Sequence, residues 1–449
     1  MPKATHYFEK DGASVDIDLH DEDSVKNVWE KLASATNLTP KQTIKIYHSN
    51  GCLIPIGSKI PKNHEHSRYK LVVMEGSTID SQEEKTRKNL SVIQKKMEQL
   101  KRFSHSKVKD ENIVLKPAIS KVNELMDNLK PLNISSIKKI PMFPESTYES
   151  LKTPQLDIWV FSENELIHLI AQKFHRLGLV KHFKINEDTL FRFLVVISKA
   201  YNANPFHNFK HCFCVTQMMY CLLHLDNLHE RLTMVEKLAL IVGSIGHDID
   251  HPGLNNAYQM NALTMLSVTY NDSSPLENHH CASLFSILRQ PECNILENLS
   301  PTDYKDTRKI IIGCILATDM GKHAECIGKL REIGPNFNID EPAHRTLLLQ
   351  TLLKCADISN EARPKEVAEK WVDCLLEEFF AQSDREKEEK LPTAPFMDRN
   401  KVTKPSAQVG FIGFVLLPLF EDTSKLLPGL KPLICNIQQS KQFYLNYIG

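Results

Sequence analysis

The sequence lacks a long apolar run, a net charge and paired cysteines, and each absence excludes a class of protein. No stretch of about 18 apolar residues occurs, so we expect no membrane-spanning helix. Lysine plus arginine and aspartate plus glutamate both number 55, so no overall charge attracts nucleic acid. The 11 cysteines include no CxxC pair, and the first residues form no apolar signal segment. We therefore expect a cytoplasmic protein with reduced thiols.

Residues 1–76 have the mixed pattern of a small α+β module. Apolar and polar residues alternate over 15–20, which predicts a half-buried strand. Residues 24–35 have the spacing of a short helix, and further strands are predicted over 44–47 and 69–74. The apolar stripe of this helix consists of Val25, Val28, Trp29 and Leu32. A strand, a helix and two more strands in so few residues suggest a ubiquitin-like module.

Residues 77–156 are predicted to form a helical segment followed by a linker. Apolar residues recur at steps of three and four over 80–104, at Leu90, Ile93, Met97 and Leu100. This row of apolar residues fits an amphipathic helix packed on its own chain. It fits equally a coiled coil that joins two chains, so a homodimer is one of the two hypotheses. A second helix is predicted over 118–129. The prolines, serines and lysines of 131–156 predict the linker.

Residues 157–449 predict one large all-α domain, because strand patterns are absent and helical spacing recurs. The segments with this spacing are 166–177, 211–225, 234–245, 307–315, 345–355 and 367–382. Each places apolar residues on one face at the helical period. We expect the chemistry of the chain in this domain.

Two histidines begin the candidate site. His207 and His211 are four residues apart, which places them on one face if their segment is helical. Such a pair alone is more often a surface or core feature than a pair of ligands. His247 and Asp248 directly follow an apolar helix and offer one imidazole and one carboxylate to the same cation. A polar helix end in solvent is the alternative for these two residues.

A further carboxylate, that of Asp357, continues the apolar stripe of Leu349 and Leu353. A lone buried aspartate needs a partner, although a helix end in solvent also explains it. Two histidines and two aspartates with free water positions indicate a divalent cation site, for Zn²⁺ first and then Mg²⁺ or Mn²⁺. Two adjacent metals are the usual device for phosphoryl transfer.

Four segments resemble the class I cyclic-nucleotide phosphodiesterases. They are His247 to Tyr258, Tyr270 to His280, Leu316 to Met320 and Gln408 to Ile412, which follow one another in the family's order. The resemblance extends over about 157 to 449. The segments 205–214 and 394–399 are most similar to the high-affinity cGMP-specific branch, whereas the first 156 residues resemble that branch only loosely.

The resemblance implies a two-metal site. It assigns the ligands of a tight Zn²⁺ to His211, His247, Asp248 and Asp357. Asp248 would also bridge to a second metal, Mg²⁺ or Mn²⁺, whose waters would be held by His251, Glu277 and Thr318. A hydroxide would attack phosphorus in line.

The resemblance assigns the general acid to His207 and the carboxylate that orients it to Glu378. The sequence supports this independently, because Trp371, Leu375 and Glu378 share one stripe of a helix. A carboxylate behind an imidazole stabilises the protonated form that an acid needs. A surface glutamate beside Glu377 is the alternative.

The resemblance assigns the purine pocket to Gln408 and Phe411. The glutamine amide would hydrogen-bond the base edge and the phenyl ring would stack on its face. Spacing alone favours a polar turn and a core phenylalanine instead. Further pocket walls would be Asn360, Met320, Phe396 and Leu376. Because a glutamine reads guanine or adenine by flipping its amide, the cGMP prediction rests on the branch resemblance.

Two positions depart from the family pattern. Phe206 stands where many members have tyrosine, as expected in the cGMP-specific branch, and Phe379 stands where that branch has tyrosine. The second change puts close inheritance of nucleotide preference in doubt. His279 and His280 are not needed as ligands of the predicted metals, and we interpret them mainly as structural.

We therefore predict hydrolysis of cGMP to 5′-GMP, which ends cyclic nucleotide signalling. Alternatives are a dual-specificity or cAMP-preferring phosphodiesterase, a His-Asp metal phosphohydrolase acting on other nucleotides, and a non-catalytic binding protein. The joint presence of His207, Glu378, Gln408 and Phe411 disfavours the phosphohydrolase. A binding protein would be expected to have lost a metal ligand or the acid, and none is missing.

Overall fold

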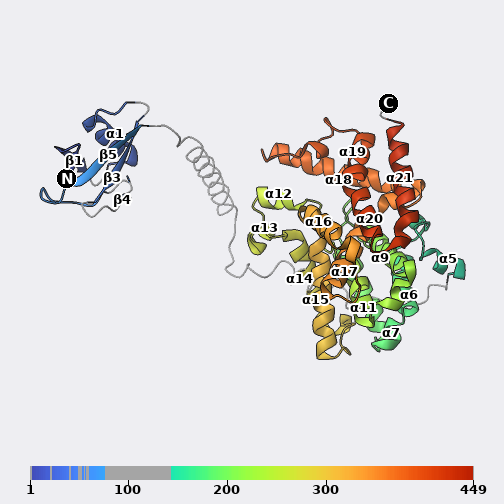
Figure 1. Cartoon of the computed structure of the whole chain (residues 1–449). Coiled ribbons are helices and arrows are strands. Elements are labelled where there is room, and N and C mark those ends of the chain that lie inside the picture. Colours follow the sequence, from blue (N-terminus) through green and yellow to red (C-terminus); the bar gives the residue numbers. More distant parts are fainter. Residues whose placement is uncertain are drawn as a thin grey trace. The chain divides into compact units, whose positions relative to one another are not determined.

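The computed structural model describes residues 3–20, 23–39, 42–48, 53–54, 56, 60–75 and 143–447, which fall into two compact units. The first unit contains all the strands of these described residues (Figure 1). Its elements are β1 (Lys3–Lys10), β2 (Ala13–His20), α1 (Val25–Ala35), β3 (Gln42–Tyr47), β4 (Leu53–Ile54) and β5 (Tyr69–Glu75).

The five strands form one sheet in the order β2-β1-β5-β3-β4. β1 and β2 are antiparallel and joined at Asp11 and Gly12, which both have positive φ, as a tight hairpin requires. β1 pairs with β5 in parallel, and β3 pairs with β4 and β5 antiparallel. The small α+β fold is confirmed, although β1 and β4 were not predicted.

The predicted apolar stripe of α1 is wrong for two of its four residues. Val28 and Leu32 are 1% and 0% exposed, whereas Val25 and Trp29 are 50% and 41% exposed. The buried pair is one i,i+4 row that faces the sheet core. A short helix on a small sheet therefore buries one row instead of two.

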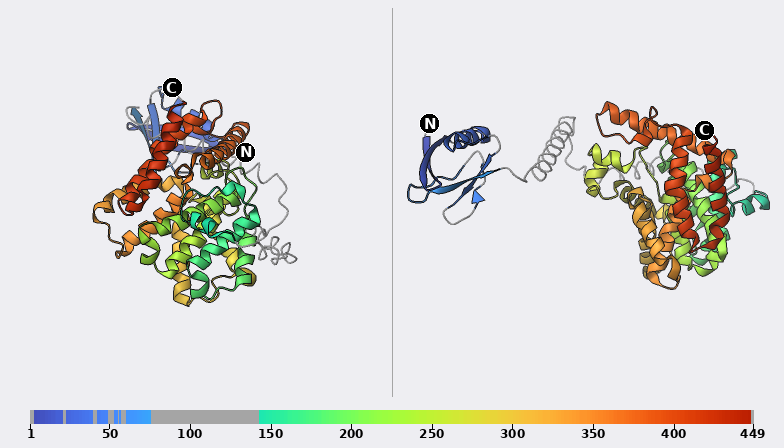
Figure 2. Two further views of the ribbon diagram at one scale, coloured as in Figure 1. Left: turned by 90° about the vertical axis from the view of Figure 1, so that its right-hand side faces the viewer. Right: turned by 45° about the horizontal axis from the view of Figure 1, so that its top comes forward.

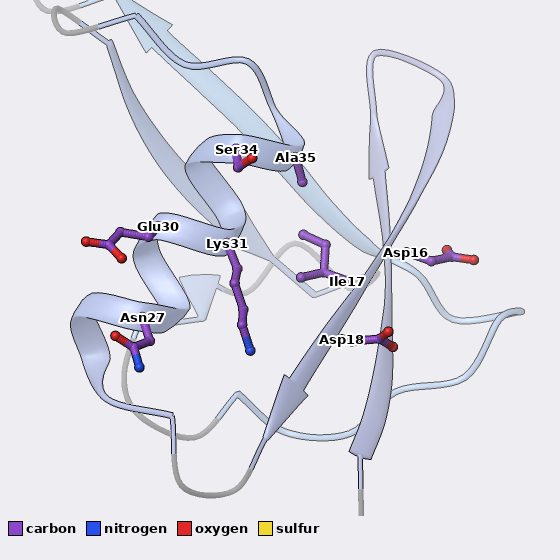
Figure 3. A pocket seen from close by; sticks show the side chains of 8 residues that line it. All are labelled: Asp16, Ile17, Asp18, Asn27, Glu30, Lys31, Ser34 and Ala35. Atoms are coloured by element: carbon purple, nitrogen blue, oxygen red, sulfur yellow. The ribbon is translucent and has the colours of Figure 1, made fainter.

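A shallow groove lies between α1 and β2 (Figure 3). Its lining mixes acidic, basic and neutral side chains from Asp16, Ile17, Asp18, Asn27, Glu30, Lys31, Ser34 and Ala35. Among the described residues, the clusters that could hold a metal ion lie in the other unit. The groove is therefore not the candidate active site.

The second unit is built from helices throughout its described residues (Figures 1 and 2). Its α-helices are α5 (Glu145–Ser150), α6 (Glu163–Arg176), α7 (Leu179–His182), α8 (Glu187–Ala200), α9 (Phe209–His224), α10 (Leu228–Arg231), α11 (Met234–Gly246), α12 (Asn256–Asn261), α13 (Met265–Tyr270), α14 (Pro275–Leu288), α15 (Pro301–Thr318), α16 (His323–Ile333), α17 (Pro342–Asp357), α18 (Lys365–Glu388), α19 (Lys404–Phe411), α20 (Leu417–Ser424) and α21 (Lys431–Leu445). Short 3₁₀ turns lie at Ile158–Val160, Leu225–Asn227, Pro291–Cys293, Met320–Lys322, Gly334–Asn336, Asn360–Ala362, Pro395–Met397 and Pro428–Leu430, and a π-helix at Ile412–Leu416.

The centre of this unit consists of four packed helices. α11 packs against α9, α15 and α17, and α17 also packs against α9 and α15. α9 and α11 are buried on nearly all sides, which explains their nearly continuous apolar sequences. Each predicted helical segment of 157–449 lies mostly within an observed helix, so the all-α prediction is confirmed. No helix among the described residues is both long and apolar enough to cross a membrane.

The end of the predicted linker is instead part of the packed unit. Residues 145–150 form α5, and Tyr148, Leu151 and Leu156 belong to the large core. The linker prediction is wrong for 143–156 because this segment finds an apolar surface on the helices. The helices predicted over 80–104 and 118–129 lie outside the described residues. Division of the chain at 76 and 156 stays a prediction.

Candidate active site

Three helix ends meet at the candidate site. The N-cap of α9 is Asn208, whose side-chain oxygen accepts hydrogen bonds from the backbone N–H groups of Lys210 and His211. This cap places His211 in the first turn of α9. His247 directly follows the last residue of α11, and Asp357 is the last residue of α17. The packing of these helices therefore brings distant segments of the chain together.

Four of the predicted site residues form a tight cluster. Nε2 of His211 lies 3.2 Å from Oδ1 of Asp357 and 3.3 Å from Oδ2 of Asp248. Nε2 of His247 lies 3.1 Å from the same Asp248 oxygen and 3.3 Å from the same Asp357 oxygen. The four ligand atoms all lie within 4.8 Å of one another. The cluster is thus compact enough for one cation to contact all four.

The chemistry of this cluster fits a divalent cation. Nδ1 of His247 lies 2.9 Å from the Ser244 carbonyl, to which it donates, so Nε2 is the ring nitrogen that faces the cluster. Burial would raise the pKa of Asp248, but the facing imidazoles of His247 and His211 hold that pKa well below its usual value. Two imidazole nitrogens and two ionised carboxylates are a ligand set typical of Zn²⁺.

His207 and His211 do not share a helical face, because α9 begins only at Phe209. His207 instead lies before the helix and pairs through Nδ1 with Oε1 of Glu378. The other oxygen of Glu378 accepts the backbone N–H groups of Phe206 at 3.0 Å and His207 at 3.1 Å. Glu378 is 4% exposed, so it is buried and not a surface glutamate. One carboxylate therefore holds both the ring and the backbone of His207.

The ring of His207 stacks on the ring of His251, with 4.0 Å between their centroids. Burial would lower the pKa of His207, but Glu378, Asp248 and Asp357 outweigh burial and raise it. The pKa of His251 is held well below its usual value by burial and by His207. Nδ1 of His251 accepts the backbone N–H of Gly253, which fits a neutral ring. These opposite pKa directions favour the cationic form of His207 and the neutral form of His251.

Glu277 and Thr318, two residues predicted to hold waters at the second metal, are 8% and 7% exposed. Glu277 lies in the first turn of α14 and accepts both hydrogen bonds of the Asn256 amide, at 3.1 and 2.9 Å. Burial raises the pKa of Glu277 to about 7. The two lie at the beginning of α14 and the end of α15, helices that pack against each other.

Comparison with known proteins identifies the family of this chain. Residues 206–437 match the family described as 3′5′-cyclic nucleotide phosphodiesterase. The chain belongs to this family. The matched range includes the whole ligand cluster and the paired His207 and Glu378. The chain is therefore an enzyme that hydrolyses cyclic nucleotides, and hypotheses outside the family are set aside.

Individual phosphodiesterases are similar to this chain. The mouse high affinity cGMP-specific 3′,5′-cyclic phosphodiesterase 9A is 39% identical over 99% of this chain and 90% of its own length. The human protein of that name is 51% identical over 69% of this chain and 53% of its own length. The crystal structure of the phosphodiesterase domain of the RhoPDE fusion protein from Salpingoeca rosetta has a TM-score of 0.64 and 32% identity, covering 70% of this chain and 98% of that domain.

The residues predicted to line the phosphodiesterase pocket lie on several elements. Gln408 and Phe411 are three residues apart on α19, so they share a helix face; Gln408 is 4% exposed and Phe411 packs on the core. Leu376 on α18 is 7% exposed and Asn360 begins a 3₁₀ turn three residues after Asp357. Met320 and Phe396 are 45% and 57% exposed. Phe396 contacts Phe379 edge to face, with ring centroids 6.0 Å apart.

Sequence reasoning missed two residues that hold the phosphodiesterase site in place. The hydroxyl of Tyr201 donates to the Ile245 carbonyl at 2.9 Å and accepts the backbone N–H of Asp248 at 3.4 Å. The amide of Asn204 donates to the carbonyls of His207 at 3.0 Å and His251 at 2.7 Å. The polar residues just before His207 were the available signal, but their partners Ile245, Asp248 and His251 lie 44 to 47 residues later in the chain.

The additional histidines have structural contacts, as interpreted from the sequence. Nε2 of His279 lies 2.9 Å from Oδ2 of Asp250. Nδ1 of His280 lies 2.7 Å from the Ile249 carbonyl, and its Nε2 lies 3.7 Å from Asp248. Burial lowers the pKa of His280 to about 4, so this ring is neutral beside the cluster.

Proposed function

We propose that this phosphodiesterase hydrolyses cGMP to 5′-GMP with two divalent cations and so ends a cyclic nucleotide signal. The observation that carries the proposal is the position of the His207–Glu378 pair beside a cluster of two histidines and two aspartates. A phosphodiester hydrolase needs both parts, because one site must activate water and another must protonate the leaving oxygen.

In this proposal, His211, His247, Asp248 and Asp357 hold Zn²⁺. Asp248 would also be a ligand of the second cation, Mg²⁺ or Mn²⁺, whose waters would be held by His251, Glu277 and Thr318. When bound, the two cations lower the pKa of water and neutralise the phosphate oxygens. The buried carboxyl of Glu277 and the neutral ring of His251 both suit hydrogen bonds to such waters.

His207 is the proton donor in this proposal. An oxygen from water would bond to phosphorus as the bond between phosphorus and O3′ breaks, and the proton on Nε2 of His207 would move to O3′ as that oxygen leaves. Glu378 holds Nδ1 of the same ring, so only Nε2 faces the substrate. The raised pKa of His207 keeps the proton available near neutral pH.

Glu378→Gln should lower kcat at least about tenfold and change its pH dependence. The carboxylate raises the pKa of His207, so its neutral replacement lowers that pKa. The acid then loses its proton at a lower pH, and the alkaline limb of the kcat profile moves to lower pH. Kinetics between pH 6 and 10 measure this, and an unmoved limb would exclude Glu378 as the group that tunes the acid.

Gln408 and Phe411 bind the purine in this proposal. The amide of Gln408 would hydrogen-bond the base edge and the ring of Phe411 would stack on its face, with walls from Asn360, Leu376, Met320 and Phe396. The preference for guanine is supported by similarity to relatives in mouse and human that are named cGMP-specific.

Gln408→Ala should raise KM for cGMP about tenfold with a small change in kcat, because one or two hydrogen bonds to the base are lost and the metal chemistry is not. Steady-state kinetics measure both constants. Gln442→Ala is the matched control, since Gln442 lies on α21 and its amide contacts Asn446 at an exposed position. An unchanged KM in Gln408→Ala would place the purine elsewhere.

Side-by-side kinetics on cGMP and cAMP test the base preference. A kcat/KM for cGMP at least about tenfold above that for cAMP, equivalent to 1.4 kcal/mol, supports the proposal. Equal values would favour a dual-specificity enzyme, and the reverse ratio a cAMP-preferring one. Adding dGTP and a phosphomonoester to the same assay tests the proposed requirement for a cyclic phosphate.

A further inference from the structure

Side chains take the place of the missing backbone partners at the C-terminal end of α15. The last carbonyl groups of any α-helix have no N–H partner within the helix. In α15 the hydroxyl of Thr318 donates to the Ile315 carbonyl at 2.8 Å, and Nζ of Lys322 donates to the Leu316 carbonyl at 3.3 Å. The following carbonyls are bound by one residue from another helix.

That residue is Lys354 of α17, which is 0% exposed. Its Nζ donates to three consecutive carbonyls, those of Ala317 at 3.1 Å, Thr318 at 3.2 Å and Asp319 at 3.1 Å. An ammonium has three protons, so every donor of Lys354 is used on this one turn. A cation at a helix C-terminus is also favoured by the helix dipole.

The same turn is held from its other side. Oδ2 of Asp319 accepts the hydroxyl of Ser274 at 2.7 Å, and Oδ1 accepts the backbone N–H of Gly321 at 2.8 Å. Ser274 directly precedes α14, whose first turn carries Glu277. Lys354 itself lies three residues before Asp357 on α17. The turn at 317–319 therefore connects α17, which carries Asp357, to the segments that carry Thr318 and Glu277.

We propose that Lys354 is a positioning residue for the second cation site, and this inference rests on the proposed role of Thr318 at that site. Lys354 holds the end of α15 at a fixed place relative to Asp357. Burial lowers the pKa of Lys354, and the neighbouring carboxyl groups of Asp357, Asp319 and Glu277 oppose that effect. Without Lys354, the carbonyls of Ala317 and Thr318 lose their donor, while that of Asp319 keeps the backbone N–H of Lys322 at 3.1 Å. The turn with Thr318 is then free to shift.

The test is equilibrium binding of Mn²⁺ to the full-length, zinc-loaded protein, measured from the electron paramagnetic resonance signal of free Mn²⁺. Lys354→Met keeps the length of the side chain and removes its donors and charge. We expect Kd for Mn²⁺ to rise about tenfold to a hundredfold, as for other groups that orient metal ligands, with zinc content unchanged. The concentration of Mn²⁺ for half-maximal turnover should rise in parallel.

Lys322→Met is the matched control, because Lys322 caps the same helix end through a single carbonyl. We expect it to bind Mn²⁺ within about twofold of the wild-type value. A wild-type Kd in Lys354→Met, or an equal weakening in Lys322→Met, would overturn the inference. If circular dichroism shows that Lys354→Met is unfolded, Lys354→Gln takes its place, and a wild-type Kd there has the same meaning.

The wild-type protein separates this inference from the proposed function. If the wild-type protein binds no second cation, or turns over no cyclic nucleotide, the proposed function fails. If it does both and the Lys354 variants bind Mn²⁺ normally, only the positioning role fails.

Discussion

Replacing His207 with alanine lowers the turnover of cyclic nucleotide by roughly 10²–10⁴-fold, the range that a general acid contributes. The leaving O3′ then departs without a proton donor, whereas the four clustered residues are untouched. The zinc content of the variant should equal that of the wild-type protein, because Nδ1 of His207 is occupied by Glu378. Single-turnover kinetics and elemental analysis of the same preparation measure the two quantities.

A double variant is the sharpest control for this result. Glu378 acts on the reaction only through His207. Adding Glu378→Gln to the His207→Ala variant should therefore lower turnover little further. If the fold losses in turnover of the two single variants multiply in the double variant, the two residues act separately. Loss of zinc together with His207 would mean that this residue is a ligand and not the acid.

Asp357→Ala abolishes metal binding and activity together. Asp357 supplies one of the four clustered ligand atoms, and its carboxylate neutralises part of the charge of the cation. The remaining His211, His247 and Asp248 no longer form the proposed four-ligand zinc site. Elemental analysis after dialysis and turnover at saturating cyclic nucleotide measure the result.

Asp384→Ala is a matched control for this prediction, because Asp384 is an exposed carboxylate paired with Arg399 at 2.7 Å. Its removal should leave zinc content and turnover unchanged, since exposed ion pairs contribute little. Full turnover in a metal-analysed Asp357→Ala sample would remove Asp357 from the site. Adding Zn²⁺ or Mn²⁺ back to the variant distinguishes weaker binding from a lost site.

The helices could be predicted because their signal is local. The apolar spacing of 234–245 corresponds to α11 almost residue for residue, and that of 345–355 lies within α17. Burial against a partner is harder to predict, because it depends on a surface that the segment itself does not contain. For that reason Trp29 is exposed despite its place on an apolar stripe, and Tyr148 is buried within a predicted linker.

The candidate site could be predicted as a set of residue types but not as an arrangement. Resemblance to the family assigned different roles to His207 and His211, whereas their spacing would place them on one face only if a helix contained both. The N-cap at Asn208 separates the two residues, because α9 begins after His207 and includes His211. Lys354 escaped notice because its three carbonyl partners lie 35 to 37 residues earlier in the chain.

The sequence by itself determined the all-α class, the family resemblance and the identity of the residues that the structure gathers. These depend on local periodicity and on residue types in a fixed order, which a linear chain records directly. Only the tertiary structure decided which ring Glu378 holds, which histidine of the stacked pair has the raised pKa and which lysine binds the carbonyls at the end of α15. Such contacts join positions far apart in the chain, and they exist only once the helices have packed.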